Sequence, residues 1–136
     1  MKNNGIRGFV LLLAGIMVCS FSPEEAAVGK ISFPLGNVLL LSKGETRFQK
    51  ASFNTPVKNG DKIETKKQSR CEITYDDGSV VRIDEQSIYT IEKVAIESDK
   101  KEVESKLSIG KLWANLKKLI AMSIIMSVAQ KVIVQI

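Results

Sequence analysis

Three pairs of neighbouring carboxylates are the residues of this sequence whose types and spacing could do chemistry. They are Asp76 with Asp77, Asp84 with Glu85, and Glu97 with Asp99. Paired acids can hydrolyse glycosidic bonds or hold calcium. Each pair lies in a predicted turn, however, and sequence neighbours on a strand point to opposite faces. We therefore interpret them as solvated turn acids, and a small enzyme that uses them is the least favoured hypothesis.

Other catalytic groups are sparse. The sequence has no histidine, which removes the commonest general base and a common metal ligand. It also has no phosphate-cradling glycine loop, no Ser-His-Asp set and no Cys/His cluster. We therefore predict a protein that is not an enzyme and that uses no cofactor and no metal.

The two cysteines, Cys19 and Cys71, have different expected roles. Cys71 alternates with Ile73 and Tyr75, which predicts a buried thiol on a strand. Cys19 ends an apolar leader, where a lipidated cysteine would stand, so it is a candidate for lipidation. Val18 precedes it, whereas lipoprotein signals prefer a small residue there, and a plain leader cysteine is the favoured interpretation.

Residues 1–27 have the pattern of a secretory signal peptide. Its features are Lys2, Arg7 and the apolar run Gly8–Cys19. The run is shorter than the ~20 apolar residues that a membrane span needs. Cleavage near Ser20 fits better than cleavage after Ala26 or Ala27, and retention as a short uncleaved anchor is the alternative. The leader predicts export to the periplasm or cell envelope.

Charge is distributed unevenly along the chain, which has a net charge of +5. Residues 30–110 carry 14 basic and 13 acidic residues, so the body is nearly neutral. Residues 111–136 carry four lysines and no acid. A nucleic-acid-binding domain normally has a basic face on its body, so we predict no nucleic-acid partner.

Short strands separated by Gly, Asn and Asp turns are predicted through most of the body. They fall at residues 28–33, 37–41, 46–50, 62–65, 71–75, 80–84, 88–96 and 102–109. Asp77 and Gly78 fit a two-residue hairpin turn. In the last strand, Val103, Leu107 and Ile109 are expected on one face.

Leucines at helical spacing follow these strands. Leu112, Leu116, Leu119 and Ile120 predict a short amphipathic helix from Lys111 to about Ile120. The predicted fold is therefore all-β, a small sandwich or roll of short antiparallel strands with a short C-terminal helix.

The order of four segments resembles the FecR-type extracytoplasmic domain. The segments are Val28–Ile31, Pro56–Thr65, Ser69–Ile83 and Gly110–Trp113. The resemblance covers residues 28 to about 118 and implies a β-rich domain outside the cytoplasmic membrane that binds a protein or envelope component. The namesake regulators add a cytoplasmic segment, which controls a sigma factor, and a membrane span. This sequence shows neither pattern, so it is more similar to the stand-alone exported members.

Seven motif positions accompany this resemblance. They are Gly60, Asp61, Thr65, Asp77, Gly78, Ser79 and Trp113. The glycines are expected to adopt backbone conformations closed to other residues, and the aspartates to accept hydrogen bonds from turn amides. A structural role is favoured over a binding role for the set.

Residues 119–136 are apolar and lack the turn signals of the body. Three interpretations stay open. The helix continues and buries Ile124, Ile125 and Val128; or the segment lies on an anionic membrane surface; or the domain end is truncated or frameshifted and these residues are non-native. The residues favour the third interpretation.

The sequence thus favours a non-enzymatic extracytoplasmic binding or scaffold module. Its expected partner is an envelope protein or a cell-wall polymer. The alternative is a membrane-surface protein held by its basic, apolar C-terminal tail. Tyr89, Arg82 and Trp113 are the side chains to examine as contact residues. The sequence does not specify the oligomeric state.

Overall fold

The structure, a computed structural model, describes residues 23–96, 101–117, 121–126 and 130–135. Its strands are β1 (Gly29–Leu35), β2 (Val38–Leu41), β3 (Gln49–Lys50), β4 (Pro56–Val57), β5 (Lys62–Thr65), β6 (Arg70–Tyr75), β7 (Val80–Ile83), β8 (Ser87–Ile96), β9 (Lys101–Asn115), β10 (Ala121–Met126) and β11 (Gln130–Gln135). No helix occurs in these ranges, so the all-β prediction is confirmed. The predicted signal peptide lies mostly, and Cys19 entirely, outside the described residues.

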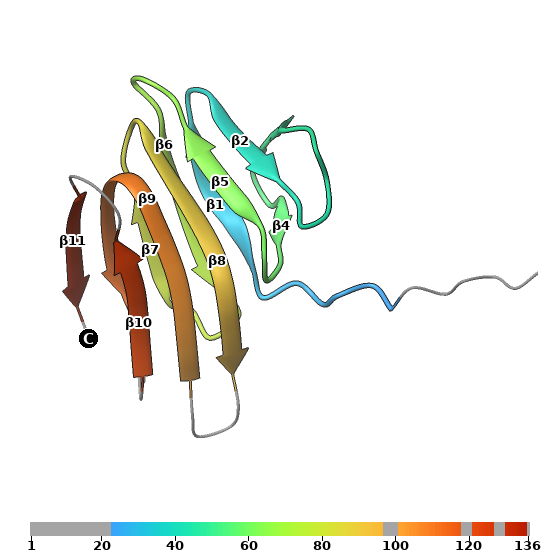
Figure 1. The fold of residues 1–136 in the computed structure, drawn as a ribbon, viewed down its shortest axis with the longest axis vertical. Helices are drawn as coiled ribbons and strands as arrows, with labels where there is room; N and C mark the ends of the chain where they lie inside the picture. The colour runs from blue at the N-terminus through green and yellow to red at the C-terminus, as the bar shows by residue number, and fades with distance from the viewer. Residues whose placement is uncertain (1–22, 97–100, 118–120, 127–129, 136) are drawn as a thin grey trace, which may run out of the picture.

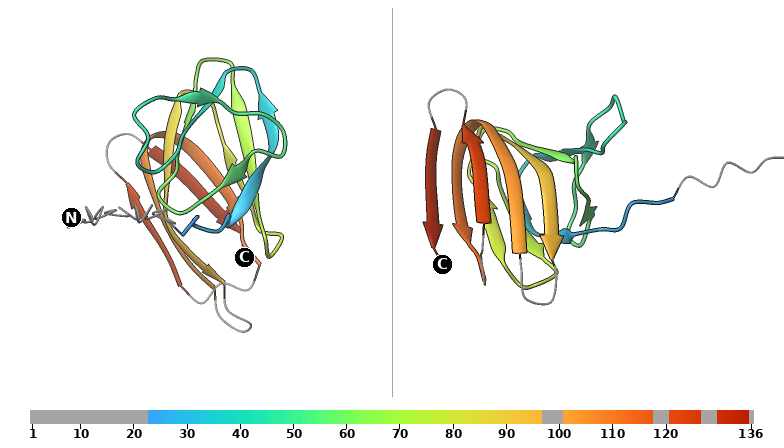
Figure 2. Two further views of the ribbon diagram at one scale, coloured as in Figure 1. Left: turned by 90° about the vertical axis from the view of Figure 1, so that its right-hand side faces the viewer. Right: turned by 60° about the horizontal axis from the view of Figure 1, so that its bottom comes forward.

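The strands form one sheet that curls on itself into two layers (Figures 1 and 2). The first layer contains β3, β2, β5, β8, residues 101–109 of β9, and β10. The second layer contains β4, β1, β6, β7, residues 110–115 of β9, and β11. The long β9 therefore passes from one layer into the other. Strands β10 and β11 each pair in parallel with β9, whereas the other pairs are antiparallel.

The core lies between the layers and takes alternate residues of the strands. Its largest fully buried side chains include Tyr75, Tyr89, Ile31, Ile63, Ile73, Ile83, Ile91 and Leu107. The Tyr89 hydroxyl lies 3.0 Å from the Tyr75 hydroxyl and 2.7 Å from Ser105 Oγ. These contacts satisfy hydroxyl groups that burial would otherwise leave without partners.

The predicted helix after Lys111 is wrong, because residues 111–115 form the end of β9. Leu119 and Ile120, which belonged to that prediction, lie outside the described residues. Leu112, Ala114 and Leu116 are buried, whereas Lys111 is exposed, which is the period of two of a strand. Two leucines four residues apart share a face in a strand as well as in a helix, so their spacing did not distinguish the two.

Strand β9 bends at Gly110, which has φ of +103°. The pairing register between β8 and β9 changes beside this bend. Opposite β8, Ile109 pairs with Ile88 whereas Leu107 pairs with Tyr89, so one extra residue enters β9 there. This bulge reverses which residues face inward. It explains why Ile109, predicted on the face of Val103 and Leu107, is 47% exposed.

The hairpin between β6 and β7 also differs from its prediction. The Tyr75 amide donates to the Ser79 carbonyl and the Gly78 amide to the Tyr75 carbonyl. The loop therefore has three residues, 76–78, instead of a two-residue turn. Gly78, at φ of +79°, supplies the left-handed residue that such loops require.

The segment after residue 120 continues the sheet. Residues 102–107 of β9 pair with β10, and residues 110–115 pair with β11. A helix through Ile124 and Ile125 is therefore wrong, and Val128 lies outside the described residues. Within the described ranges, the chain has no helix with the length and apolarity to cross a membrane.

Candidate binding surface

The outer face of the second layer carries a row of four residues opposite one another on neighbouring strands. This Trp113 row consists of Glu72, Arg82, Trp113 and Ile133. The residues that flank them on the same strands, such as Ile73, Ile83 and Leu112, are buried in the core. Because strand side chains alternate, packing of the core forces the row outward.

A cation–π contact lies at the centre of this row. The Arg82 guanidinium carbon lies 5.1 Å from the centroid of the Trp113 ring. Arg82 Nε donates a 2.6 Å hydrogen bond to Glu72 Oε1, which holds the guanidinium in place. Trp113 is half-buried, so part of its ring remains open to a partner.

A second row runs alongside the first. This Lys111 row consists of Arg70, Asp84, Lys111 and Lys131. Arg70 Nε donates to Asp84 Oδ1 at 3.3 Å. Lys111 and Lys131 lie directly opposite each other on β9 and β11, and both are exposed. Among the described residues, neither lysine forms an ion pair.

The two rows line a cavity of about 270 Å³. Apart from Glu72, every member of the two rows contributes to its walls, together with Leu112. The cavity therefore combines an aromatic ring and an exposed isoleucine with four cations and one carboxylate. Its size suits a side chain or another small group.

Exposed apolar side chains extend this face onto β1. Phe33 lies opposite Glu72 and Leu35 opposite Arg70, and they are 53% and 51% exposed. Ile133, at the other end of the face, is 44% exposed. We call the two rows together with Phe33 and Leu35 the binding surface.

A family model supplies an independent observation on the same part of the chain. The family described as FecR protein matches residues 61–133, more than half of the 136 residues. The chain belongs to the FecR protein family. The resemblance inferred from the sequence is thus confirmed, and the matched stretch contains both rows of the binding surface. No curated protein and no solved structure matched the chain.

The FecR family is a regulatory family associated with signalling at the cell envelope. The first motif positions of this FecR protein make contacts with the backbone. Gly60 has φ of +87°. The buried Asp61 carboxylate accepts hydrogen bonds from the amides of Lys43 (3.0 Å) and Lys58 (2.9 Å). Thr65 Oγ1 donates to the Asp84 carbonyl at 2.6 Å.

The second group of FecR motif positions surrounds a buried ion pair. Asp77 Oδ1 accepts from the Ser79 amide at 3.0 Å, and Oδ2 accepts from Lys101 Nζ at 2.7 Å. Ser79 Oγ in turn accepts from the Lys117 amide at 2.8 Å. Lys101 is only 3% exposed, so its ammonium group is buried beside Asp77. Its ammonium also lies 5.2 Å from the centroid of the Tyr75 ring.

Of the side chains selected from the sequence for examination, two come together. Arg82 and Trp113 are in contact on the binding surface, whereas Tyr89 is buried in the core. Arg70, Lys131 and Ile133 of the binding surface were not predicted as contact residues from the sequence. Strand alternation could have suggested Arg70, but the other two depend on the parallel pairing of β11 with β9.

The carboxylate pairs do not converge. Asp84 binds Arg70, whereas Glu85 Oε2 accepts from the Gln68 amide at 2.7 Å. Asp77 is held by Lys101, whereas Asp76 is exposed. The pair Glu97 and Asp99 lies outside the described residues. Within the described residues, no three His, Cys, Asp or Glu side chains form a group that could hold a metal ion.

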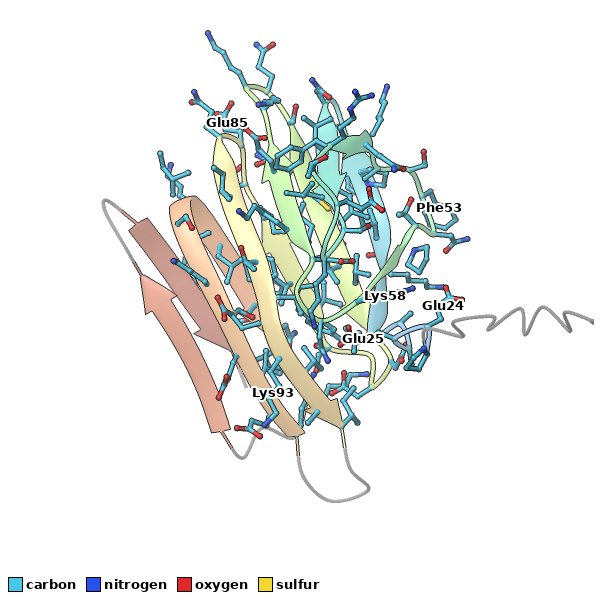
Figure 3. All side chains as sticks on the ribbon, turned by 45° about the vertical axis from the view of Figure 1, so that its right-hand side comes forward. Glu24, Glu25, Phe53, Lys58, Glu85 and Lys93 are labelled. Carbon is cyan, nitrogen blue, oxygen red and sulfur yellow. The ribbon has the colours of Figure 1, made fainter. Side chains whose placement is uncertain are left out.

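A larger cavity of about 700 Å³ lies beside the segment that precedes β1. Glu24 and Glu25 project from that segment near Lys58 (Figure 3). They form ion pairs with Lys58 (3.1 Å) and Lys43 (3.4 Å). Because the chain's own acids already neutralise these lysines, the cavity is a weaker candidate for an anionic partner than the binding surface.

Cys71 is predicted to be unreactive in the folded protein. Its thiol is buried, and burial, with a smaller contribution from Glu72, raises its pKa to about 12. Because the thiolate is the nucleophile, we expect iodoacetamide to label Cys71 far more slowly in buffer than in urea. A Cys19→Ser background isolates this thiol. Equal labelling rates in the two solvents would show that Cys71 is accessible in the native state.

Proposed function

We propose that this FecR protein is a non-enzymatic module that docks a protein partner outside the cytoplasmic membrane through the binding surface. The observation that carries the proposal is the contact of Arg82 with a half-buried Trp113 on an outward-facing row of strands. The proposal includes export by residues 1–27 and a structural role for the motif positions at Gly60, Asp61, Thr65, Asp77, Gly78 and Ser79.

The composition of the surface supports a protein partner. Tryptophan and arginine are enriched among the residues that contribute most to protein–protein binding. Phe33, Leu35 and Ile133 add exposed apolar area around them, which a partner would remove from water. A cell-wall polymer, being largely polar, would leave much of this apolar area without a complement.

The strand pairing beneath the surface also supports docking. Four paired strands carry the Trp113 row, and Glu72 fixes the position of Arg82. Side chains that are already ordered lose little conformational entropy on binding, so more of the contact energy appears as affinity.

Photo-cross-linking in cells tests the proposal. Phe33 is replaced by p-benzoylphenylalanine, which keeps an aromatic side chain at an exposed position of the binding surface. We expect illumination to trap a discrete protein adduct. The matched control places the same group at Lys106, which lies on the part of β9 that belongs to the first layer. It is expected to give no such adduct.

The specificity of the adduct is checked with Trp113→Ala in the Phe33 cross-linking background. Loss of the adduct is expected because the central aromatic contact is removed. An adduct of equal yield from Lys106, or one that persists in full in Trp113→Ala, would contradict docking on this surface. Trapping of glycan instead of protein would favour the cell-wall polymer.

A further inference from the structure

We propose that the partner recognised by the binding surface presents an acidic segment, with a carboxylate between Lys111 and Lys131 and an apolar side chain against Trp113. This inference rests on the proposed function and specifies the chemistry of its partner. The observation behind it is the placement of two like charges directly opposite each other beside the only tryptophan of the chain.

The two lysines are unfavourably placed in the unbound protein. Lys111 and Lys131 are partners in the β9–β11 ladder, and like charges at directly opposite positions repel. A carboxylate between them would convert this repulsion into two attractive contacts. An anion should therefore stabilise this pair of lysines more than it would stabilise an isolated surface lysine.

The neighbouring arginines already have acidic partners, so the two lysines are the groups expected to bind a carboxylate of the partner. Arg82 is bound by Glu72, and Arg70 is bound by Asp84, so both guanidinium groups already have acidic partners. The lysines have none among the described residues, which gives the surface an excess of positive charge. This excess is local, because residues 30–110 are nearly neutral.

The walls of the cavity favour an acidic protein segment over a purely polyanionic ligand. Trp113 and Ile133 border the cavity beside the lysines, and its volume of about 270 Å³ suits one or two side chains. An extended segment that alternates acidic and apolar residues would place carboxylates near Lys111 and Lys131 and an apolar side chain against Trp113. An acidic glycan would match the charges but not the apolar wall.

The test uses the full-length protein and the intrinsic fluorescence of Trp113, the only tryptophan in the chain. The probe is a random copolymer of glutamate and tyrosine, compared with poly-glutamate and with polygalacturonate. We expect the copolymer to bind most tightly and its affinity to fall as salt is added. The double variant Lys111→Gln/Lys131→Gln should bind it about tenfold more weakly, in the range expected for losing two charge contacts.

The matched control is Lys62→Gln/Lys106→Gln, which removes the same charge from the first layer and should leave binding unchanged. A second readout is stability, because removing the opposed charges at Lys111 and Lys131 should raise the urea midpoint while it weakens binding. If these lysines had a purely structural role, the double variant would lower both the urea midpoint and the affinity for the copolymer.

Three outcomes would overturn the inference. Equal loss of affinity in the control variant would show that only net charge matters. Equal affinity for polygalacturonate would assign the site to an acidic glycan. Failure of the copolymer to bind, while Phe33 still traps a protein adduct, would remove the acidic segment but leave the proposed function standing. If the adduct is also absent, the proposed function fails with it.

Discussion

Replacement of Gly110 by alanine is expected to lower the free energy of unfolding by about 3 kcal/mol or more. Gly110 has φ of +103°, a conformation that residues with a side chain rarely adopt. An added Cβ would also lie 2.0 Å from Ser87 Oγ and 2.6 Å from Ser87 Cα. Because the second of these atoms belongs to the backbone, rotation of the serine side chain would not relieve the clash.

Gly44→Ala is the matched control for this substitution. Gly44 has φ of +84°, but an added Cβ there would meet nothing within 4 Å. Gly44→Ala should therefore lower the free energy of unfolding only by the backbone strain, about 1 kcal/mol. Urea unfolding of both variants separates strain from the close approach to Ser87. Equal losses in the two variants would mean that β9 accommodates the side chain by shifting.

The bend at Gly110 also bears on the binding surface. It carries β9 from the first layer into the second, where Trp113 lies opposite Arg82. A variant that folds with a relaxed bend should therefore change the emission of Trp113 as well as stability, since the cation–π contact depends on this register.

The second large effect is expected at the buried ion pair. Asp77→Asn should lower the free energy of unfolding by about 3 kcal/mol, because the Lys101 ammonium is then left buried without a carboxylate. Lys101 is only 3% exposed, and its Nζ lies 2.7 Å from Asp77 Oδ2. The measurement is urea unfolding at neutral pH. Removal of both charges in Asp77→Asn/Lys101→Met should recover part of the loss.

Asp77 should also determine part of the acid dependence of stability. Partial burial acts to raise its pKa, but hydrogen bonds from Lys101 and Ser79 outweigh it and hold the pKa below its ordinary value of 3.8. Such a group stabilises the fold fully above its unfolded-state pKa and loses that contribution as pH falls through the folded-state pKa. Stability of the wild-type protein should therefore decline below about pH 4.

Asp77→Asn should lack this part of the decline, whereas Asp76→Asn should retain it. Asp76 is the neighbouring aspartate of the same turn, but its side chain is exposed, and its replacement should change stability by no more than about 0.5 kcal/mol. Equal effects of the two substitutions would contradict the assignment of the buried partner of Lys101 to Asp77.

Much of the fold was predictable because alternation of apolar residues is a local signal. Cys71, Ile73 and Tyr75 alternate with polar residues, and all three are buried on β6 as expected. The helix predicted after Lys111 was wrong because the spacing of Leu112 and Leu116 fits a strand as well as a helix. The exposure of Ile109 shows a second limit of this signal. A bulge at Gly110 shifts the inward-facing positions of β9 by one, and this shift depends on pairing with β8, which no local pattern contains.

The binding surface was less predictable than the core. Arg82 and Trp113 were selected separately, but their contact requires the register between β7 and β9. The parallel pairing of β11 with β9 brings Lys131 and Ile133 beside them. The apolar composition of residues 119–136 did not predict that this segment would form a strand next to Trp113. Tyr89 resembled a contact residue by type, but its hydroxyl is satisfied inside the core by Tyr75 and Ser105.

The most direct test of docking through the binding surface is the yield of the protein adduct from p-benzoylphenylalanine at Phe33, measured with and without Trp113→Ala. Docking through this surface should give a discrete adduct that disappears when the tryptophan is removed, while the urea midpoint confirms that the variant remains folded. An adduct of undiminished yield in the folded Trp113→Ala variant would show that the partner does not dock on Trp113.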